Sequence, residues 1–140
     1  QPHGNFWMLV SIALVWIVDA GAYFIGSRFG KTAVLPKLSP KKSLEGFFGG
    51  LSFGVVFGFL IGLIVQSFMP ELSPLKGAIF GLLMGFVAFF GDALMSLLKR
   101  TMAVKDTGCI LPGHGGILDR LDSMFWAFFM GLLFATTSLF

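Results

Sequence analysis

Acidic and basic side chains concentrated between residues 92 and 122 are the part of this chain best able to do chemistry. Asp92, Asp119 and Asp122 offer hard oxygen ligands. Such ligands suit Mg²⁺, which takes one or two protein carboxylates and completes its shell with water and substrate phosphates. The pattern predicts phosphoryl or nucleotidyl transfer, in which positioning and charge neutralisation supply most of the rate. The cations that could neutralise the phosphates are Lys41, Lys42, Lys99, Arg100, Lys105 and Arg120.

His114 lies between two glycines in the same segment. It could act as a general acid or base, donate a hydrogen bond to a phosphate, or tie the loop down. We favour the substrate-contact and structural roles. The single Cys109 excludes an internal disulfide and a cysteine-based zinc cluster.

The composition indicates an integral membrane protein. Of the 140 residues, 56% are hydrophobic and only 12% are charged, whereas soluble domains are about 25% charged. Four apolar runs are each about long enough to cross a bilayer as a helix. The net charge of +3 comes from cations between these runs, so we expect no nucleic-acid partner. The sequence predicts one all-α, polytopic domain over 1–140, with spans at about 6–26, 45–68, 75–98 and 121–140.

Small residues recur along the second and third spans. In the second span, glycines recur every fourth residue, which predicts a groove where another helix approaches closely. In the third, a stripe of small residues leads to Asp92, which favours an interior site over a helix-capping role. Asp19 in the first span either faces a polar interior or caps the polar end of its helix. The two stripes are Gly46, Gly50, Gly54, Gly58 and Gly62, and Gly77, Gly81, Gly85, Ala88, Asp92 and Ser96.

A basic loop is expected between the first two spans, over residues 28–42. Pro36 and Pro40 exclude a continuous helix there, and Ser43 is a plausible N-cap of the next helix. Gly26 and Gly30, with Lys31 and Thr32 after them, resemble a phosphate-binding P-loop. Only three residues separate the two glycines instead of four, and a membrane span precedes them instead of a strand, so we reject that interpretation. The cations of the loop either bind phosphate or merely hold the loop in the cytoplasm or against anionic lipid.

Lysine and arginine are distributed unevenly between the two sides of the predicted bundle. Nine of the ten lie in the segments after the first and third spans, and only Lys76 lies elsewhere. The positive-inside rule places both segments in the cytoplasm. The two polar segments can then meet at one face of a four-helix bundle.

Several segments between residues 19 and 122 have the order and spacing of a known signature. Upstream are Asp19-x-Gly21-Ala22-Tyr23-Phe24 and Ser39-Pro40-Lys41-Lys42-Ser43-x-Glu45-Gly46. Downstream are Ser96-x-Leu98-Lys99-Arg100, Lys105-Asp106-x-Gly108 and Leu111-Pro112-x-His114-Gly115-Gly116-Ile117-x-Asp119-Arg120-Leu121-Asp122.

Together these segments resemble the phosphatidate cytidylyltransferases, or CDP-diacylglycerol synthases. The resemblance implies Mg²⁺-dependent condensation of CTP with phosphatidate to CDP-diacylglycerol and pyrophosphate, with a second cation and a homodimer left open. It also implies a multi-pass protein of a bacterial-type inner membrane, with its active site facing the cytoplasm. Members of that family are usually longer, with further spans before the matched region, so the chain resembles their C-terminal, catalytic half.

The resemblance also suggests roles for individual residues. Asp92 and Asp119 would be metal ligands, and Asp122 would be an alternative ligand or would support one. Phosphates would be held by Lys99, Arg100, Lys105 and Arg120, and CTP would be reached by Lys41 and Lys42. The expected substrate-binding set is completed by Ser39, Ser96, His114, Gly115 and Gly116.

Two other classes of function compete with this interpretation. One is a non-catalytic fragment or lipid-binding membrane protein that retains the family fold. The other is an anion transporter, for which inverted repeats and polar groups at mid-bilayer would be expected. The sequence shows neither feature, so the transporter hypothesis is weak.

Overall fold

The computed structural model describes residues 4–35, 39–69, 72–101 and 118–137. Four helices dominate it: α1 (Gly4–Phe29), α2 (Leu44–Val65), α3 (Pro74–Thr101) and α4 (Leu118–Thr137). Helices α1, α2 and α3 are long and apolar enough to cross a membrane, whereas the apolar part of α4 that is described, Met124–Leu133, is shorter. The predicted all-α, polytopic membrane fold is confirmed.

A short hairpin joins α1 to α2, where a loop was expected. Strand β1 (Ala33–Leu35) pairs antiparallel with β2 (Ser39–Ser43), and Arg28 belongs to the last turn of α1 rather than to the loop. Pro40 is compatible with β2 because a two-stranded ribbon has only edge strands. The expected exclusion of a continuous helix is correct, but the extended pairing was missed.

The glycine stripe of α2 lets this helix pack closely against both α1 and α3. A Cβ atom on Gly50 would lie 3.1 Å from both the Val18 carbonyl oxygen and the Ala22 Cβ atom of α1. Further along α2, a Cβ on Gly54 would lie 2.5 Å from the carbonyl oxygen of Gly81 in α3. The predicted groove is therefore confirmed. Its first part contacts α1, and its later part contacts α3.

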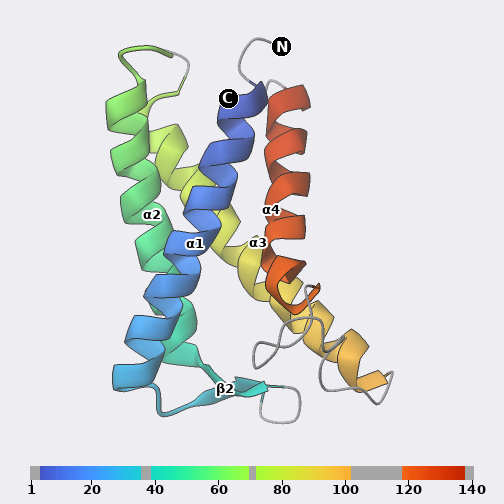
Figure 1. Cartoon of the computed structure of the whole chain (residues 1–140). Helices are drawn as coiled ribbons and strands as arrows, with labels where there is room; N and C mark the ends of the chain where they lie inside the picture. Colours follow the sequence, from blue (N-terminus) through green and yellow to red (C-terminus); the bar gives the residue numbers. More distant parts are fainter. Residues whose placement is uncertain (1–3, 36–38, 70–71, 102–117, 138–140) are drawn as a thin grey trace.

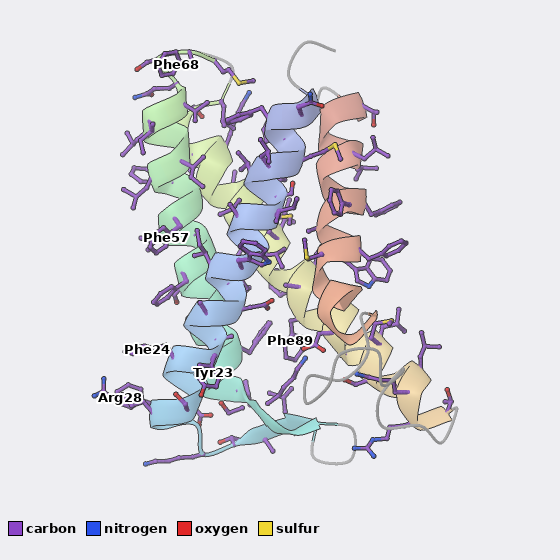
Figure 2. All side chains as sticks on the ribbon, in the orientation of Figure 1. Tyr23, Phe24, Arg28, Phe57, Phe68 and Phe89 are labelled. Carbon is purple, nitrogen blue, oxygen red and sulfur yellow. The ribbon has the colours of Figure 1, made fainter. Side chains whose placement is uncertain are left out.

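Most of the apolar core lies between α1, α3 and α4. Leu14 and Met84 are fully buried, and the ring of Trp7 packs edge-on against Phe80 with centroids 5.3 Å apart. Many large apolar side chains instead face outward, among them Phe57 and Phe68 (Figure 2). An apolar outer surface is what lipid contact requires.

The hairpin, the end of α3 and the beginning of α4 lie at the same end of the bundle (Figure 1). The start of α1 and the end of α4 lie at the opposite end. The helix ends that flank both polar segments of the sequence are thus brought to one end, as the charge distribution predicted.

Candidate functional site

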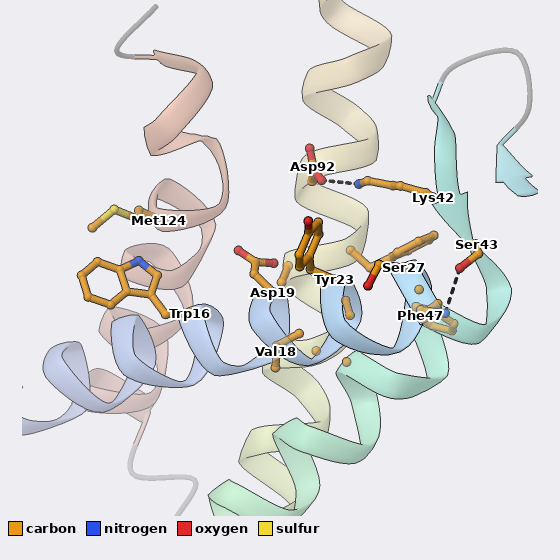
Figure 3. Close-up of a pocket in the computed structure, with 17 residues that line it drawn as sticks. Trp16, Val18, Asp19, Tyr23, Ser27, Lys42, Ser43, Phe47, Asp92 and Met124 are labelled. Atoms are coloured by element: carbon orange, nitrogen blue, oxygen red, sulfur yellow. Dashed lines mark hydrogen bonds and ion pairs between the residues drawn. The ribbon is translucent and has the colours of Figure 1, made fainter. Parts of the chain in front are cut away.

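A cavity of about 820 Å³ opens near the hairpin end of the bundle. All four helices and β2 contribute to its lining (Figure 3). The polar part includes the charged residues Asp19, Lys42 and Asp92, and the apolar part includes Val18 and Met124. A charged group and an apolar group could therefore be held side by side in one space.

An ion pair joins two elements that are far apart in the sequence. The ammonium group of Lys42 on β2 contacts a carboxylate oxygen of Asp92 on α3. The Lys42 ammonium also lies 5.3 Å from the centre of the Phe89 ring, one turn before Asp92. The two side chains are 22% and 39% exposed, so the pair contributes little to stability, about 1 kcal/mol or less. Its main effect is to fix a cation and a carboxylate together at the cavity.

The junction of the hairpin with α2 places Lys42 over α3. Ser43, the next residue, has an extended backbone and caps α2 by accepting a hydrogen bond of 3.1 Å from the Gly46 backbone N–H. This confirms the predicted N-cap. A Cβ on Gly46 would lie 2.9 Å from the carbonyl oxygen of Ala22, so α2 begins in direct contact with α1.

The small-residue stripe of α3 leads to Asp92 as predicted. Gly85 and Ala88 line the cavity with it, and both are buried. One position before Asp92, a Cβ on Gly91 would lie 2.9 Å from the indole nitrogen of Trp126. The close approach of α4 at this point helps fix the turn of α3 that carries the carboxylate.

Helix α1 adds a polar stripe at four-residue spacing. Asp19, Tyr23 and Ser27 all line the cavity (Figure 3). Asp19 lies well inside α1, so it faces the candidate site and does not cap the helix end. Neither Tyr23, which was quoted only as part of the signature, nor Ser27 was predicted as a site residue, although their spacing from Asp19 could have identified both.

The other predicted site residues fall into three groups. Ser96, Lys99 and Arg100 lie further along α3 and do not line this cavity. For a second group the structure describes the backbone element but not the side chains: Ser39 and Lys41 in β2, and Asp119, Arg120 and Asp122 in the first turns of α4. Outside the described residues are Lys105, His114, Gly115 and Gly116.

The carboxylates are the groups that could hold a cation. Among the described residues, no three Asp, Glu, His or Cys side chains gather at one point. Asp19 and Asp92 nevertheless line the same cavity, and Met124 places the early part of α4 beside it. One or two protein carboxylates suffice for Mg²⁺ when substrate phosphates complete its shell, so these donors fit that ion.

Comparison with known proteins is consistent with this geometry. The chain is 50% identical to the phosphatidate cytidylyltransferase of Pseudomonas aeruginosa, over 88% of this chain and 45% of the relative. It is 39% identical to the Bacillus subtilis protein of the same name, over 100% of this chain and 50% of the relative. The chain thus spans about half the length of these curated relatives. The model of the cytidylyltransferase family matches residues 1–138, and the chain belongs to that family.

Proposed function

We propose that this chain forms the catalytic part of a membrane nucleotidyltransferase that condenses CTP with phosphatidate to CDP-diacylglycerol and pyrophosphate. The relatives named phosphatidate cytidylyltransferase support this reaction. The observation that carries the proposal is the Lys42–Asp92 pair at a cavity with both polar and apolar walls. Such a cavity suits a nucleotide triphosphate at one end and a lipid at the other.

The reaction needs little acid–base catalysis. A phosphate oxygen of phosphatidate, already anionic near neutral pH, attacks the α-phosphorus of CTP. A new phosphorus–oxygen bond forms there, the bond from the α-phosphorus to the oxygen bridging to the β-phosphorus breaks, and pyrophosphate leaves. The main difficulty is that two polyanions must meet, so cationic side chains and fixed geometry supply most of the rate.

The described residues can meet that need. The Lys42 ammonium would hold a phosphate of CTP, and its ion pair with Asp92 would keep this ammonium in place at the cavity. Asp92 would also be a ligand of Mg²⁺, with Asp119 and Asp122 as the further candidates from α4. When bound, Mg²⁺ would neutralise charge on the triphosphate and on the departing pyrophosphate. Lys99, Arg100, Lys105 and Arg120 would provide further phosphate contacts.

The apolar part of the cavity indicates where the lipid substrate would bind. Val18, Ala88 and Met124 line its apolar part, which would receive the glycerol backbone and the first part of the acyl chains.

We place the hairpin end in the cytoplasm, because it carries most of the Lys and Arg residues and because CTP is a cytoplasmic substrate.

Formation of CDP-diacylglycerol from radiolabelled CTP tests the proposal. The chain would be purified in detergent and assayed with phosphatidate and Mg²⁺, with and without EDTA, next to the Pseudomonas aeruginosa relative. We expect product that requires phosphatidate and Mg²⁺. The proposal fails if the folded chain makes no product while the relative is active.

A non-catalytic, lipid-binding role is the second candidate, and the apolar part of the cavity lining supports it. In that case Asp92→Asn would leave lipid binding unchanged and no CDP-diacylglycerol would form. Binding of phosphatidate without turnover, in both the unaltered and the variant chain, would favour this role.

A further inference from the structure

Glu45 closes the base of the hairpin. The backbone N–H of Thr32 donates to Oε2 of Glu45 at 3.3 Å, and the Thr32 hydroxyl donates to Oε1 at 3.2 Å. Thr32, the residue before β1, therefore contacts both carboxylate oxygens of Glu45, which lies in the first turn of α2. Beside them, the Leu44 N–H donates to the carbonyl oxygen of Thr32 at 2.8 Å.

These contacts tie together the two points where the hairpin leaves and rejoins the bundle. Next to these contacts, Ala33 of β1 pairs with Ser43 of β2. Lys42 is the residue before Ser43 in β2. A two-stranded ribbon is marginally stable by itself in water. The direction in which β2 presents Lys42 must therefore depend on how its base is fixed.

Packing on Ser43 leaves the base little room to shift. A Cβ on Gly30 would lie 2.6 Å from the Ser43 hydroxyl oxygen and 2.9 Å from its Cβ. Four residues earlier, a Cβ on Gly26 would lie 3.2 Å from the same hydroxyl oxygen. The Glu45–Thr32 contacts add a side-chain link between the residue before β1 and the first turn of α2, next to this packing.

We propose that Glu45 is a positioning residue: through Thr32 it holds the hairpin so that Lys42 stands opposite Asp92, and it thereby sets the affinity for the triphosphate of CTP. Glu45 does not itself line the cavity, so it acts through Lys42. The link to CTP rests on the proposed function. The geometric part, which links Glu45 to the Lys42–Asp92 pair, can be tested without enzymatic activity.

Steady-state kinetics test the link to CTP. We expect Glu45→Ala to raise the KM for CTP about tenfold, with a smaller change in kcat and none in the KM for phosphatidate, because hydrogen bonds to a charged group are lost. Glu45→Gln should restore most of the affinity, since its amide can accept from the Thr32 N–H and donate to the Thr32 hydroxyl oxygen. Thr32→Val, which removes only the hydroxyl contact, should have an intermediate effect.

Two further variants separate positioning from general stabilisation. Ser52→Ala, on the same helix, removes a hydroxyl that donates to the carbonyl oxygen of Phe48 and should leave the KM for CTP unchanged. In a Lys42→Ala background, Glu45→Ala should add little further loss, because residues that act through one another are not additive. Full additivity, or failure of Glu45→Gln to restore affinity, would overturn the proposal.

Carbodiimide cross-linking tests the geometry directly. The reagent converts the Asp92 carboxyl to an O-acylisourea, the Lys42 amine attacks its acyl carbon to form an amide and release the urea, and mass spectrometry measures the joined peptides. We expect a severalfold lower yield in Glu45→Ala, an unchanged yield in Ser52→Ala, and no product in Asp92→Asn. An unchanged yield in Glu45→Ala refutes the geometric part of the proposal. If the unaltered chain makes no CDP-diacylglycerol, the proposed function fails, while the cross-linking yield still decides the role of Glu45.

Discussion

Lys42 and Asp92 form an ion pair although one lies on a hairpin strand and the other on the third helix. The pair brings a cation and a carboxylate to the edge of a cavity that all four helices line. A cation that can bind phosphate is thus held beside a carboxylate that can bind a metal. The following expectations derive from this relationship and from the helix packing that supports it.

Replacing Lys42 should weaken the binding of CTP more than that of lipid. We expect Lys42→Ala to raise the KM for CTP about tenfold or more, because a charge-assisted contact to phosphate is lost. Lys42→Arg keeps the charge and should retain part of the affinity. Steady-state kinetics with each substrate varied in turn measure both effects. Equal increases in the KM values for CTP and for phosphatidate would contradict a triphosphate contact.

Close packing of α2 on α3 should make their glycines intolerant of a methyl group. Gly54→Ala would press the new Cβ against the Gly81 carbonyl oxygen. We expect a loss of about 1–3 kcal/mol in the free energy of unfolding, as for other overpacked sites. Thermal unfolding in detergent, followed by circular dichroism, measures this change.

Ala20→Val is a suitable control for that substitution. It adds side-chain volume at an exposed position of α1 and should change the unfolding temperature little. A Gly54→Ala variant as stable as this control would show that the helices are further apart than described.

Narrowing the apolar part of the cavity should affect the lipid substrate. Met124 lines the cavity, whereas its neighbour Phe125 is 69% exposed. We expect Met124→Trp to raise the KM for phosphatidate and to leave the KM for CTP nearly unchanged, because bulk is added only where the lipid would lie. Phe125→Trp is the matched control and should behave as the unaltered chain. A selective loss of CTP affinity in Met124→Trp would reverse the assignment of the two ends of the cavity.

The helical framework could be predicted because its signals are local and strong. Apolar runs of bilayer length identified the helices, and the four-residue glycine period identified the close face of α2. The Ser43 cap and the small-residue stripe leading to Asp92 were predicted for the same reason. Each depends on residues within a few turns of one another.

The features that were missed depend on long-range or weak signals. Strands of three and five residues are too short to show a two-residue period against the surrounding lysines and prolines. The pairing of Lys42 with Asp92 joins residues from separate elements, which no local pattern shows. Tyr23 was quoted only as part of the signature around Asp19, and no role was assigned to it, because an aromatic residue in a membrane helix gives no specific signal of a binding site.

The central claim is that this chain transfers a cytidylyl group by means of Asp92. Its most direct test is the rate of CDP-diacylglycerol formation by the unaltered chain and by Asp92→Asn, at saturating CTP and Mg²⁺ and at equal amounts of folded protein. We expect the substitution to lower kcat about a hundredfold or more, since it removes the carboxylate charge that would bind Mg²⁺ and that pairs with Lys42. An Asp92→Asn chain as active as the unaltered one would contradict the claim.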